Sequence, residues 1–278
     1  MAHQHKLFQD FPLNGNTDLS TGTAPTPYLV YDGHGLLITG IADADAVSNA
    51  TNNESVYPVL TTGGYAAMGI FVCDFQDASH GPHLELQVCA LVSETPGQKI
   101  SDHPFSMVAS MIAHPDWGTL CLHLWNDTAN VVAYNSEYLG LNAALARGQI
   151  TRGGGRKIFE FADDAGAVLR GNVREQKRSS LGALVQFVRQ AGLLQTIRAN
   201  AGPYIESAVI NLKGDVFADN RRARAFTAPD QTVLQYVDGA QDELKIDSPD
   251  LEAYAFQPLC LEHFTPFRFA YLHPDHSG

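Results

Sequence analysis

The side chains best suited to chemistry in this 278-residue chain lie close to Glu85. Successive side chains of a β-strand alternate between its two faces, so a strand over His83 to Val92 places His83, Glu85 and Gln87 on one face. The other face is apolar and carries Leu84, Leu86, Val88 and Ala90. A carboxyl group beside an imidazole in apolar surroundings has a raised pKa and can act as a general acid or base. We therefore predict that Glu85 and His83 are catalytic.

Two other interpretations of Glu85 remain open. The first is a solvated carboxylate on the outer face of a strand, with no functional role. The second is a metal ligand, because His80, His83 and Glu85 together offer two imidazoles and a carboxylate. Their spacing matches no zinc signature, and we predict neither a metal site nor a cofactor.

A second group of polar residues belongs to the segment from Val131 to Leu145. The pattern predicts the end of a buried strand, then a polar turn, then a short apolar segment. Hydrogen-bond donors in this region can stabilise a developing enolate oxygen, and the predicted substrate-binding residues are Tyr134, Asn135, Ser136 and Asn142. His123, in the preceding β segment, is added as an inward-pointing residue, with a satisfied core histidine as the alternative.

The segment from residue 135 to residue 144 resembles the acetoacetate decarboxylase family. In that family a strand ends in Gly-Arg-Glu, passes a small-aromatic pair and a proline, and delivers two adjacent lysines to the pocket. Residues 135–137 stand in place of Gly-Arg-Glu here, and Ala143 and Ala144 stand in place of the lysines. The family's first lysine attacks a ketone as a neutral amine. Alanine forms no Schiff base, so the resemblance implies a divergent member that lacks this decarboxylation.

Other positions extend the resemblance over residues 25–271. Glu85 lines up with a pocket glutamate of the family, and Phe226 to Pro229 resembles its aromatic-Thr-Gly-Pro turn. The arginine that shapes the family's acid-binding pocket has no counterpart, because no arginine precedes Arg147. The resemblance implies a mostly β domain with a few short helices (α+β), a closed β-cone or barrel with an internal pocket, and a homo-oligomer.

Composition limits the organisation and the partners of the chain. Residues 1–26 are predicted to form a polar N-terminal arm and residues 27–278 a single domain. With 45% hydrophobic and 17% charged residues the core can be large. The formal charge of -12 disfavours nucleic-acid and anionic-membrane partners. No run approaches the roughly 20 apolar residues of a membrane span, and four scattered cysteines indicate buried free thiols, so we expect a cytoplasmic protein.

Three further segments give structural predictions. Tyr28 to Ile41 is predicted as a hairpin with its turn at residues 32–35. Ser179 to Gly192 is predicted as a helix with its apolar stripe in the core. The Gly-rich run from Arg152 to Lys157 can hold phosphate through backbone amides, but it lacks both common phosphate-loop spacings and is predicted as a flexible loop.

Two functions follow from these observations. The first is a non-decarboxylating enzyme, in secondary metabolism, that acts by acid-base catalysis on a small oxo or enol substrate as a lyase, dehydratase, isomerase or cyclase. Glu85 would transfer the proton next to a carbonyl group. The alternative is a non-catalytic protein on the same fold that binds a small apolar carbonyl compound or serves as a scaffold. A binder would tolerate Glu85→Gln, whereas the enzyme would not.

Overall fold

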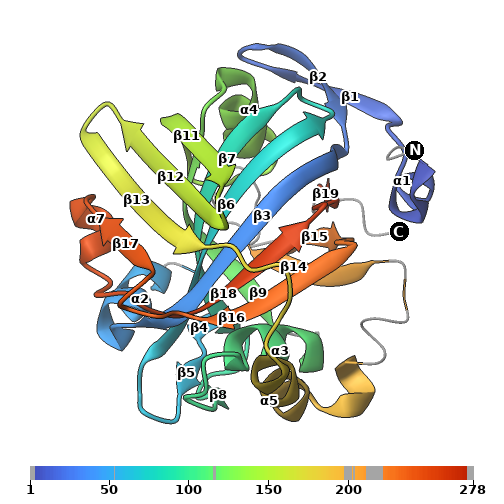
Figure 1. Cartoon of the computed structure of the whole chain (residues 1–278). Coiled ribbons are helices and arrows are strands. Elements are labelled where there is room, and N and C mark those ends of the chain that lie inside the picture. Colours follow the sequence, from blue (N-terminus) through green and yellow to red (C-terminus); the bar gives the residue numbers. More distant parts are fainter. Residues whose placement is uncertain are drawn as a thin grey trace.

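Long β-strands make up most of the chain in the computed structural model, which describes residues 4–52, 54–114, 117–196, 202, 204–210 and 222–273. The fold is mostly β with a few short helices, as predicted (Figure 1). The strands of the larger sheet are β3 (Tyr28–Ala42), β4 (Tyr57–Pro58), β5 (Leu60–Thr61), β6 (Ala66–Ala78), β7 (His83–Ser93), β8 (Lys99–Ile100), β9 (Gly118–Asn126), β10 (Ala143–Leu145), β14 (Ile205–Ile210), β15 (Arg222–Thr227), β16 (Gln231–Tyr236), β18 (Gln257–Thr265) and β19 (Phe269–Leu272).

Strand β3 connects the parts of this sheet. One edge of β3 pairs with β18 and β19, and the other edge pairs with β6 along most of its length. From β19 the pairing continues through β15, β14, β9 and β7 to β6. The strand is continuous where the sequence predicted a hairpin. Its register against β6 shifts at Asp32 and Gly33, so the glycine-rich segment forms a bulge instead of a turn.

A four-stranded sheet covers one face of the large sheet. It consists of β11 (Arg147–Gly153), β12 (Arg156–Asp163), β13 (Gly166–Arg174) and β17 (Glu243–Ile246), in that order. Figure 1 shows it beside β3, β6 and β7. Phe159, Phe161 and Leu169 pack with Ile38, Val72, Leu86 and Val88 of the large sheet in the largest apolar cluster. The opposite faces of β6 and β7 are therefore left for the cavity described below.

The helices lie around the sheets. They are α1 (Lys6–Asp10), α2 (Ala44–Thr51), α3 (Ser106–Ala113), α4 (Ala129–Ala133), the π-helix η2 (Tyr134–Tyr138), α5 (Leu181–Ala191) and α7 (Pro249–Glu252). Segment 131–138 was predicted as a strand end and a turn, and it is helical. Val131 and Tyr134, one turn apart, are fully buried in the inner apolar cluster, so tertiary burial overrides the strand propensity of the two valines.

Helix α5 has the predicted bounds and caps but not the predicted burial. Ser180 caps its first turn by accepting from Ala183 N, and Gly192 follows its last residue. Of its apolar stripe, Leu181 is 77% and Val185 is 56% exposed. The prediction that this stripe belongs to the core is therefore wrong, because the buried residues of α5 are Ala183 and Ala191, neither of which belongs to the stripe.

The N-terminal segment folds back onto the molecule. Strands β1 (Gly15–Leu19) and β2 (Gly22–Thr26) form a separate hairpin, and Leu7 and Phe8 of α1 are buried against β3 and β15. The Ser20 backbone N–H donates to Glu137 Oε2 at 2.8 Å, which fixes the tip of the hairpin to η2.

The four cysteines are buried free thiols, as predicted. Within the part of the chain that the structure describes, no helix is long and apolar enough to cross a membrane.

Candidate active site

A cavity of about 70 Å³ lies on the side of β6 and β7 that faces away from the four-stranded sheet. It has room for several water molecules, and so for a small ligand. Its polar lining comes from Glu85, Gln87, Asn135, Thr119, Thr227, Tyr28 and Tyr271. Its apolar lining comes from Phe71, Cys73, Phe75, Met111, Leu124, Leu141, Ala225, Phe267 and Phe269. Lysine and arginine are missing from this lining, within the described residues.

Glu85 is the one carboxylic acid among the described residues of this lining. It projects from β7, opposite Asn126 of β9 and Cys73 of β6. Burial raises the pKa of Glu85 to about 7, and a hydrogen bond from Asn126 Nδ2 to Glu85 Oε2 at 3.0 Å opposes part of this rise. A carboxyl group with this pKa exchanges its proton near neutral pH, which suits a general acid or base.

Asn126 and Asn135 form a buried chain behind Glu85. Asn135 Nδ2 donates to Asn126 Oδ1 at 2.9 Å, and Asn126 in turn donates to Glu85. Asn126 is 0% and Asn135 is 3% exposed. The π-helix η2 positions Asn135 on the cavity wall, in keeping with the frequent occurrence of π-turns at functional sites. Sequence reasoning found Asn135 but missed Asn126.

His83 contacts the cavity through Tyr28. The Tyr28 hydroxyl and His83 Nε2 are 2.5 Å apart, and His83 Nδ1 lies 2.8 Å from the carbonyl oxygen of Gly81. The second contact requires a proton on Nδ1, so Nε2 accepts the proton of the Tyr28 hydroxyl. Burial lowers the pKa of His83, which keeps the ring neutral. His83 therefore orients Tyr28, and Tyr28 stands between His83 and the cavity.

Tyr271 contributes an unpaired hydroxyl group to the cavity. It comes from β19, its oxygen is buried, and among the residues that the structure describes it has no hydrogen-bond partner. Burial, and after it the charges of Cys121 and Glu85, raise the pKa of Tyr271 well above its ordinary value. The group is thus a neutral donor, suited to a ligand oxygen. Nothing in the local sequence indicates this role, because β19 reaches the cavity through its long-range pairing with β3 and β15.

The remaining predicted substrate-binding residues lie off the cavity lining. Tyr134 is fully buried behind it and packs on His80 and Tyr28. Ser136 Oγ donates to the carbonyl oxygen of Val132 at 2.8 Å within its own helix. Asn142 is exposed and donates to the carbonyl oxygen of Leu122.

His123 lies on the face of β9 that points away from the cavity, in contrast to the prediction that it points inward. Its ring stacks on Trp125, and Nε2 lies 3.1 Å from the Tyr254 hydroxyl. The register between β7 and β9 explains this position, because Cys89 pairs with Cys121 while Val88 pairs with His123. Leu122 is thus an extra residue in β9, and such a bulge reverses the alternation for the residues that follow.

The alternative of a metal site at Glu85 gains no support from the geometry. His80 stacks on Tyr28 at a centroid distance of 5.2 Å, and burial lowers its pKa to about 4. Among the residues that the structure describes, no group of three or more His, Cys, Asp or Glu side chains is close enough to hold a metal ion. Lys99 is exposed, and Lys157 is a buried residue of β12 in the four-stranded sheet. Neither amine lines the cavity.

Comparisons with known proteins agree at the level of the fold. No protein-family model and no curated protein matches the sequence. Among solved structures, acetoacetate decarboxylase from Legionella pneumophila is 11% identical, with a TM-score of 0.58 over 97% of this chain and 94% of its own. A second acetoacetate decarboxylase is 10% identical, with a TM-score of 0.55 over 90% and 88% of the two chains. The enduracididine biosynthesis enzyme MppR, complexed with pyruvate, is 12% identical, with a TM-score of 0.50 over 88% of each chain.

These likenesses cover 88–97% of the chain, and they confirm the fold that the sequence resemblance implied. The identities are too low to transfer a reaction or a substrate. The alignments nevertheless cover 90% and 97% of this chain, which is enough to establish its fold. The chain has the acetoacetate decarboxylase-like fold.

Proposed function

We propose that this protein is an acid-base enzyme that moves a proton next to the carbonyl group of a small, uncharged oxo or enol compound. The observation that carries the proposal is the buried Glu85 carboxyl, whose pKa is raised to about 7, on the wall of the cavity. Removal of a proton next to a carbonyl group is a common first step in lyase, dehydratase, isomerase and cyclase reactions of such compounds. A pathway in secondary metabolism is part of the same proposal.

The residues of the cavity divide the work. Glu85 takes the proton from the carbon next to the carbonyl group and returns it later in the reaction. The Tyr271 hydroxyl donates to the carbonyl oxygen, where negative charge develops. Asn135, through Asn126, holds the Glu85 carboxyl in place, and His83 does the same for Tyr28. Because the described lining lacks Lys and Arg, it favours an uncharged substrate over a keto acid.

Schiff-base decarboxylation is not part of this proposal. Ala143 and Ala144 occupy the positions that the resemblance assigns to the lysine pair. Both belong to β10, which pairs with Leu124 and Trp125 of β9 beside the cavity.

We propose also that the large sheet closes into a cone around the cavity. The pairings of β3 with both β19 and β6 support this, because the path through β15, β14, β9 and β7 returns to β3.

The test is hydrogen-deuterium exchange at the α-carbon of a panel of small ketones, enols and oxo acids, followed by proton NMR in D₂O. We expect exchange with uncharged compounds, and a loss of about 100-fold or more in Glu85→Gln, which keeps the size of the side chain but cannot accept a proton. Asn142→Ala, a change at an exposed residue that does not line the cavity, should leave exchange unaltered.

A borohydride trap with the same panel completes the experiment. No covalent adduct and no carbon dioxide are expected. A reduced adduct on any lysine would overturn the assignment of acid-base chemistry. Absence of exchange, together with equal ligand binding by the wild type and Glu85→Gln, would favour the second candidate, a non-catalytic binding protein or scaffold on the same fold.

We propose in addition that the protein forms a homo-oligomer. The support is the exposed apolar stripe of α5, where Leu181, Leu184 and Val185 are 77%, 43% and 56% exposed. Apolar side chains gathered in this way commonly mark a contact surface.

A further inference from the structure

A second pocket, of about 360 Å³, lies on the opposite side of the large sheet from the cavity. Its lining comes from the β11–β12 hairpin, from the connection after β13, and from β16 and β18: Arg152, Gly153, Gly155, Glu175, Gln176, Lys177, Gln231, Val233, His263 and Thr265. The function proposed above uses none of these residues. This pocket also contains the glycine-rich run, which forms a tight hairpin turn at Gly154 and Gly155, both with positive φ.

His263 is the buried polar group of this pocket. It is 3% exposed, and among the described residues neither ring nitrogen has a hydrogen-bond partner of good geometry. A weak contact with the backbone of Arg174 offsets only part of the effect of burial, which lowers the pKa of His263. The nearest carboxylate oxygen, Glu175 Oε1, is 4.0 Å from Nδ1, which is too far for a hydrogen bond. Buried polar groups are normally paired, so an imidazole in this state on a pocket wall indicates a ligand that supplies the partner.

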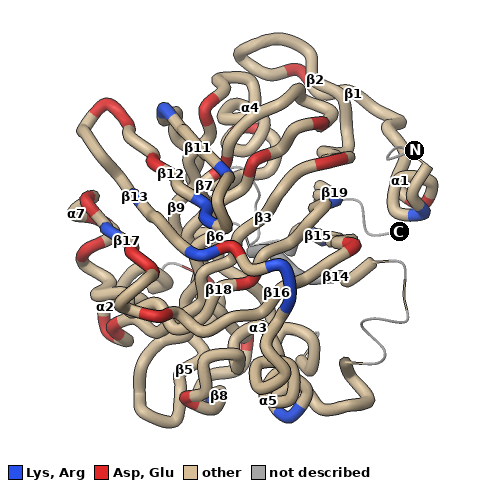
Figure 2. Tube along the Cα trace, viewed as in Figure 1, with Lys and Arg blue, Asp and Glu red and all other residues tan. Residues whose placement is uncertain are grey.

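The charges around the pocket favour an anion. Arg152 neutralises Glu175 through contacts of 2.8 and 3.1 Å from Nε to the two carboxylate oxygens. Lys177 adds a further positive charge, and it is exposed. Behind the wall, Lys157 is 0% exposed and its Nζ has no hydrogen-bond partner. Figure 2 shows Lys and Arg segments gathered on the β11–β12 hairpin and on the connection after β13, in a chain whose formal charge is -12.

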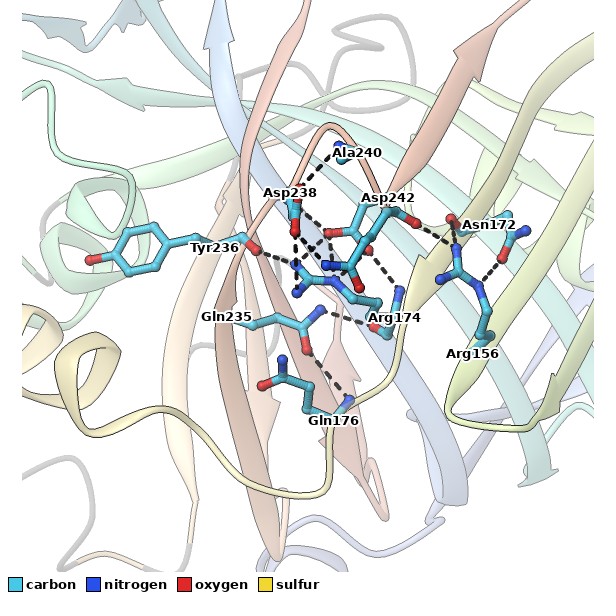
Figure 3. Close-up of polar contacts among 10 residues, drawn as sticks. Arg156, Asn172, Arg174, Gln176, Gln235, Tyr236, Asp238, Ala240 and Asp242 are labelled. Atoms are coloured by element: carbon cyan, nitrogen blue, oxygen red, sulfur yellow. Dashed lines mark hydrogen bonds and ion pairs between the residues drawn. The ribbon is translucent and has the colours of Figure 1, made fainter.

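The wall of the pocket is rigid. Arg174, which precedes Glu175, donates from Nη2 to Asp242 Oδ2 at 2.7 Å and to the carbonyl oxygen of Tyr236 at 2.9 Å (Figure 3). Gln235 Nε2 donates to the carbonyl oxygen of Arg174, and the Gln176 backbone N–H donates to Gln235 Oε1. Segment 174–177 is thus fixed on β16 and on Asp242, just before β17, before any ligand binds, which lowers the entropy lost on binding.

We propose that this outer pocket binds a small metabolite that carries one oxyanion group, of the phosphate type, on an uncharged polar body. The oxyanion group lies between His263, Lys177 and Arg152, with the Lys157 ammonium behind it. The pocket volume is several times that of the cavity, so it has room for more than the anionic group. The side chains of Gln176, Gln231 and Thr265 suit hydroxyl groups on the rest of the molecule.

Calorimetric titration of the full-length protein at low ionic strength tests this site with three probes: glycerol 3-phosphate, inorganic phosphate and glycerol. We expect glycerol 3-phosphate to bind more tightly than phosphate, and glycerol not to bind. Lys177→Gln should weaken binding of glycerol 3-phosphate about tenfold, the effect of one charge-assisted hydrogen bond. Lys99→Gln, an equal change of charge at an exposed residue outside the pocket, should leave binding unchanged.

Two further variants separate this site from folding and from the cavity. Lys157→Met removes the buried charge at a similar side-chain size, and we expect weaker binding with a melting temperature at least equal to that of the wild type, because an unpaired buried charge costs stability. Glu85→Gln should bind glycerol 3-phosphate as the wild type does. No binding of glycerol 3-phosphate at millimolar concentration, or equal weakening by Lys177→Gln and Lys99→Gln, would overturn the proposal.

Discussion

At the scale of single residues, the environment of Glu85 determines what the site can do. Alternation along β7 predicted that His83, Glu85 and Gln87 share one face, because this strand is regular from His83 to Val88. That this face lines a pocket was implied by the family resemblance. Tyr28, Asn126 and Tyr271 were beyond local reasoning, because each reaches the cavity or Glu85 only through the pairing of distant strands. The exclusion of His123 depends on one inserted residue, Leu122, and no sequence pattern shows a bulge of that kind.

Removal of the Asn126 amide is expected to raise the pKa of Glu85 above its value of about 7. The hydrogen bond from Asn126 to Glu85 Oε2 favours the ionised carboxylate and so lowers the pKa of Glu85. In Asn126→Ala this effect is lost, and the effect of burial, which raises the pKa, remains. The carbon-13 NMR signal of the Glu85 carboxyl should then titrate at higher pH. In Asn142→Ala, whose side chain bonds only a backbone carbonyl group of β9, the titration should stay in place. An unchanged or lower pKa in Asn126→Ala would show that the amide does not support the carboxylate.

At the scale of elements, sequence patterns predicted the position of strands and helices better than their surroundings. Strand β7 and helix α5 agree with their predicted ranges. The stripe of α5 was assigned to the core because an amphipathic helix usually buries its apolar side. The same periodicity is expected when the apolar side faces a second molecule, so the sequence alone does not separate the two cases.

Val185→Glu on α5 is expected to dissociate the proposed homo-oligomer. Val185 is 56% exposed and lies next to Leu181 and Leu184 on the stripe, and a carboxylate placed in an apolar interface loses its hydration. Sedimentation equilibrium should give the 30.2 kDa mass of one chain for this variant, and a multiple of it for the wild type. Gln149→Glu adds the same charge at an exposed position on β11 and should keep the wild-type mass. A wild-type monomer, or an oligomer that persists in Val185→Glu, would contradict the assignment of α5 to the interface.

At the scale of the whole molecule, two sheets bury ionisable groups on both sides of the large sheet. Glu85 lies on the cavity side, whereas Lys157 and His263 lie on the side covered by the four-stranded sheet. Composition predicted a large core but not these groups, because charged residues are rarely buried and no local pattern marks the exceptions. Their burial couples the stability of the fold to pH.

Between pH 6.5 and pH 8 the free energy of unfolding is expected to fall as pH rises. Burial raises the pKa of Glu262 from 4.5 to about 8, so the folded protein holds a proton that the unfolded chain has released, and the stability from this group is lost as pH rises towards 8. Glu85 acts in the same direction up to about pH 7. Burial lowers the pKa values of His80 and His263 to about 4 and that of Lys157 to about 8. These groups make stability rise with pH, but mainly below 6.5 for the histidines and above 8 for the lysine.

Glu262→Gln isolates this effect, because glutamine has the shape of the protonated acid and does not titrate. Urea unfolding at several pH values should show the wild type losing about 2 kcal/mol relative to Glu262→Gln between pH 6.5 and pH 8. This is the effect of a carboxyl group that titrates in this interval in the folded protein but is already ionised in the unfolded chain. Glu160→Gln, at an exposed position on β12, should keep the wild-type slope. If the Glu262→Gln and wild-type slopes were equal, Glu262 would not be the buried protonated acid that its position on β18, 1% exposed and with Oε1 unpaired, requires.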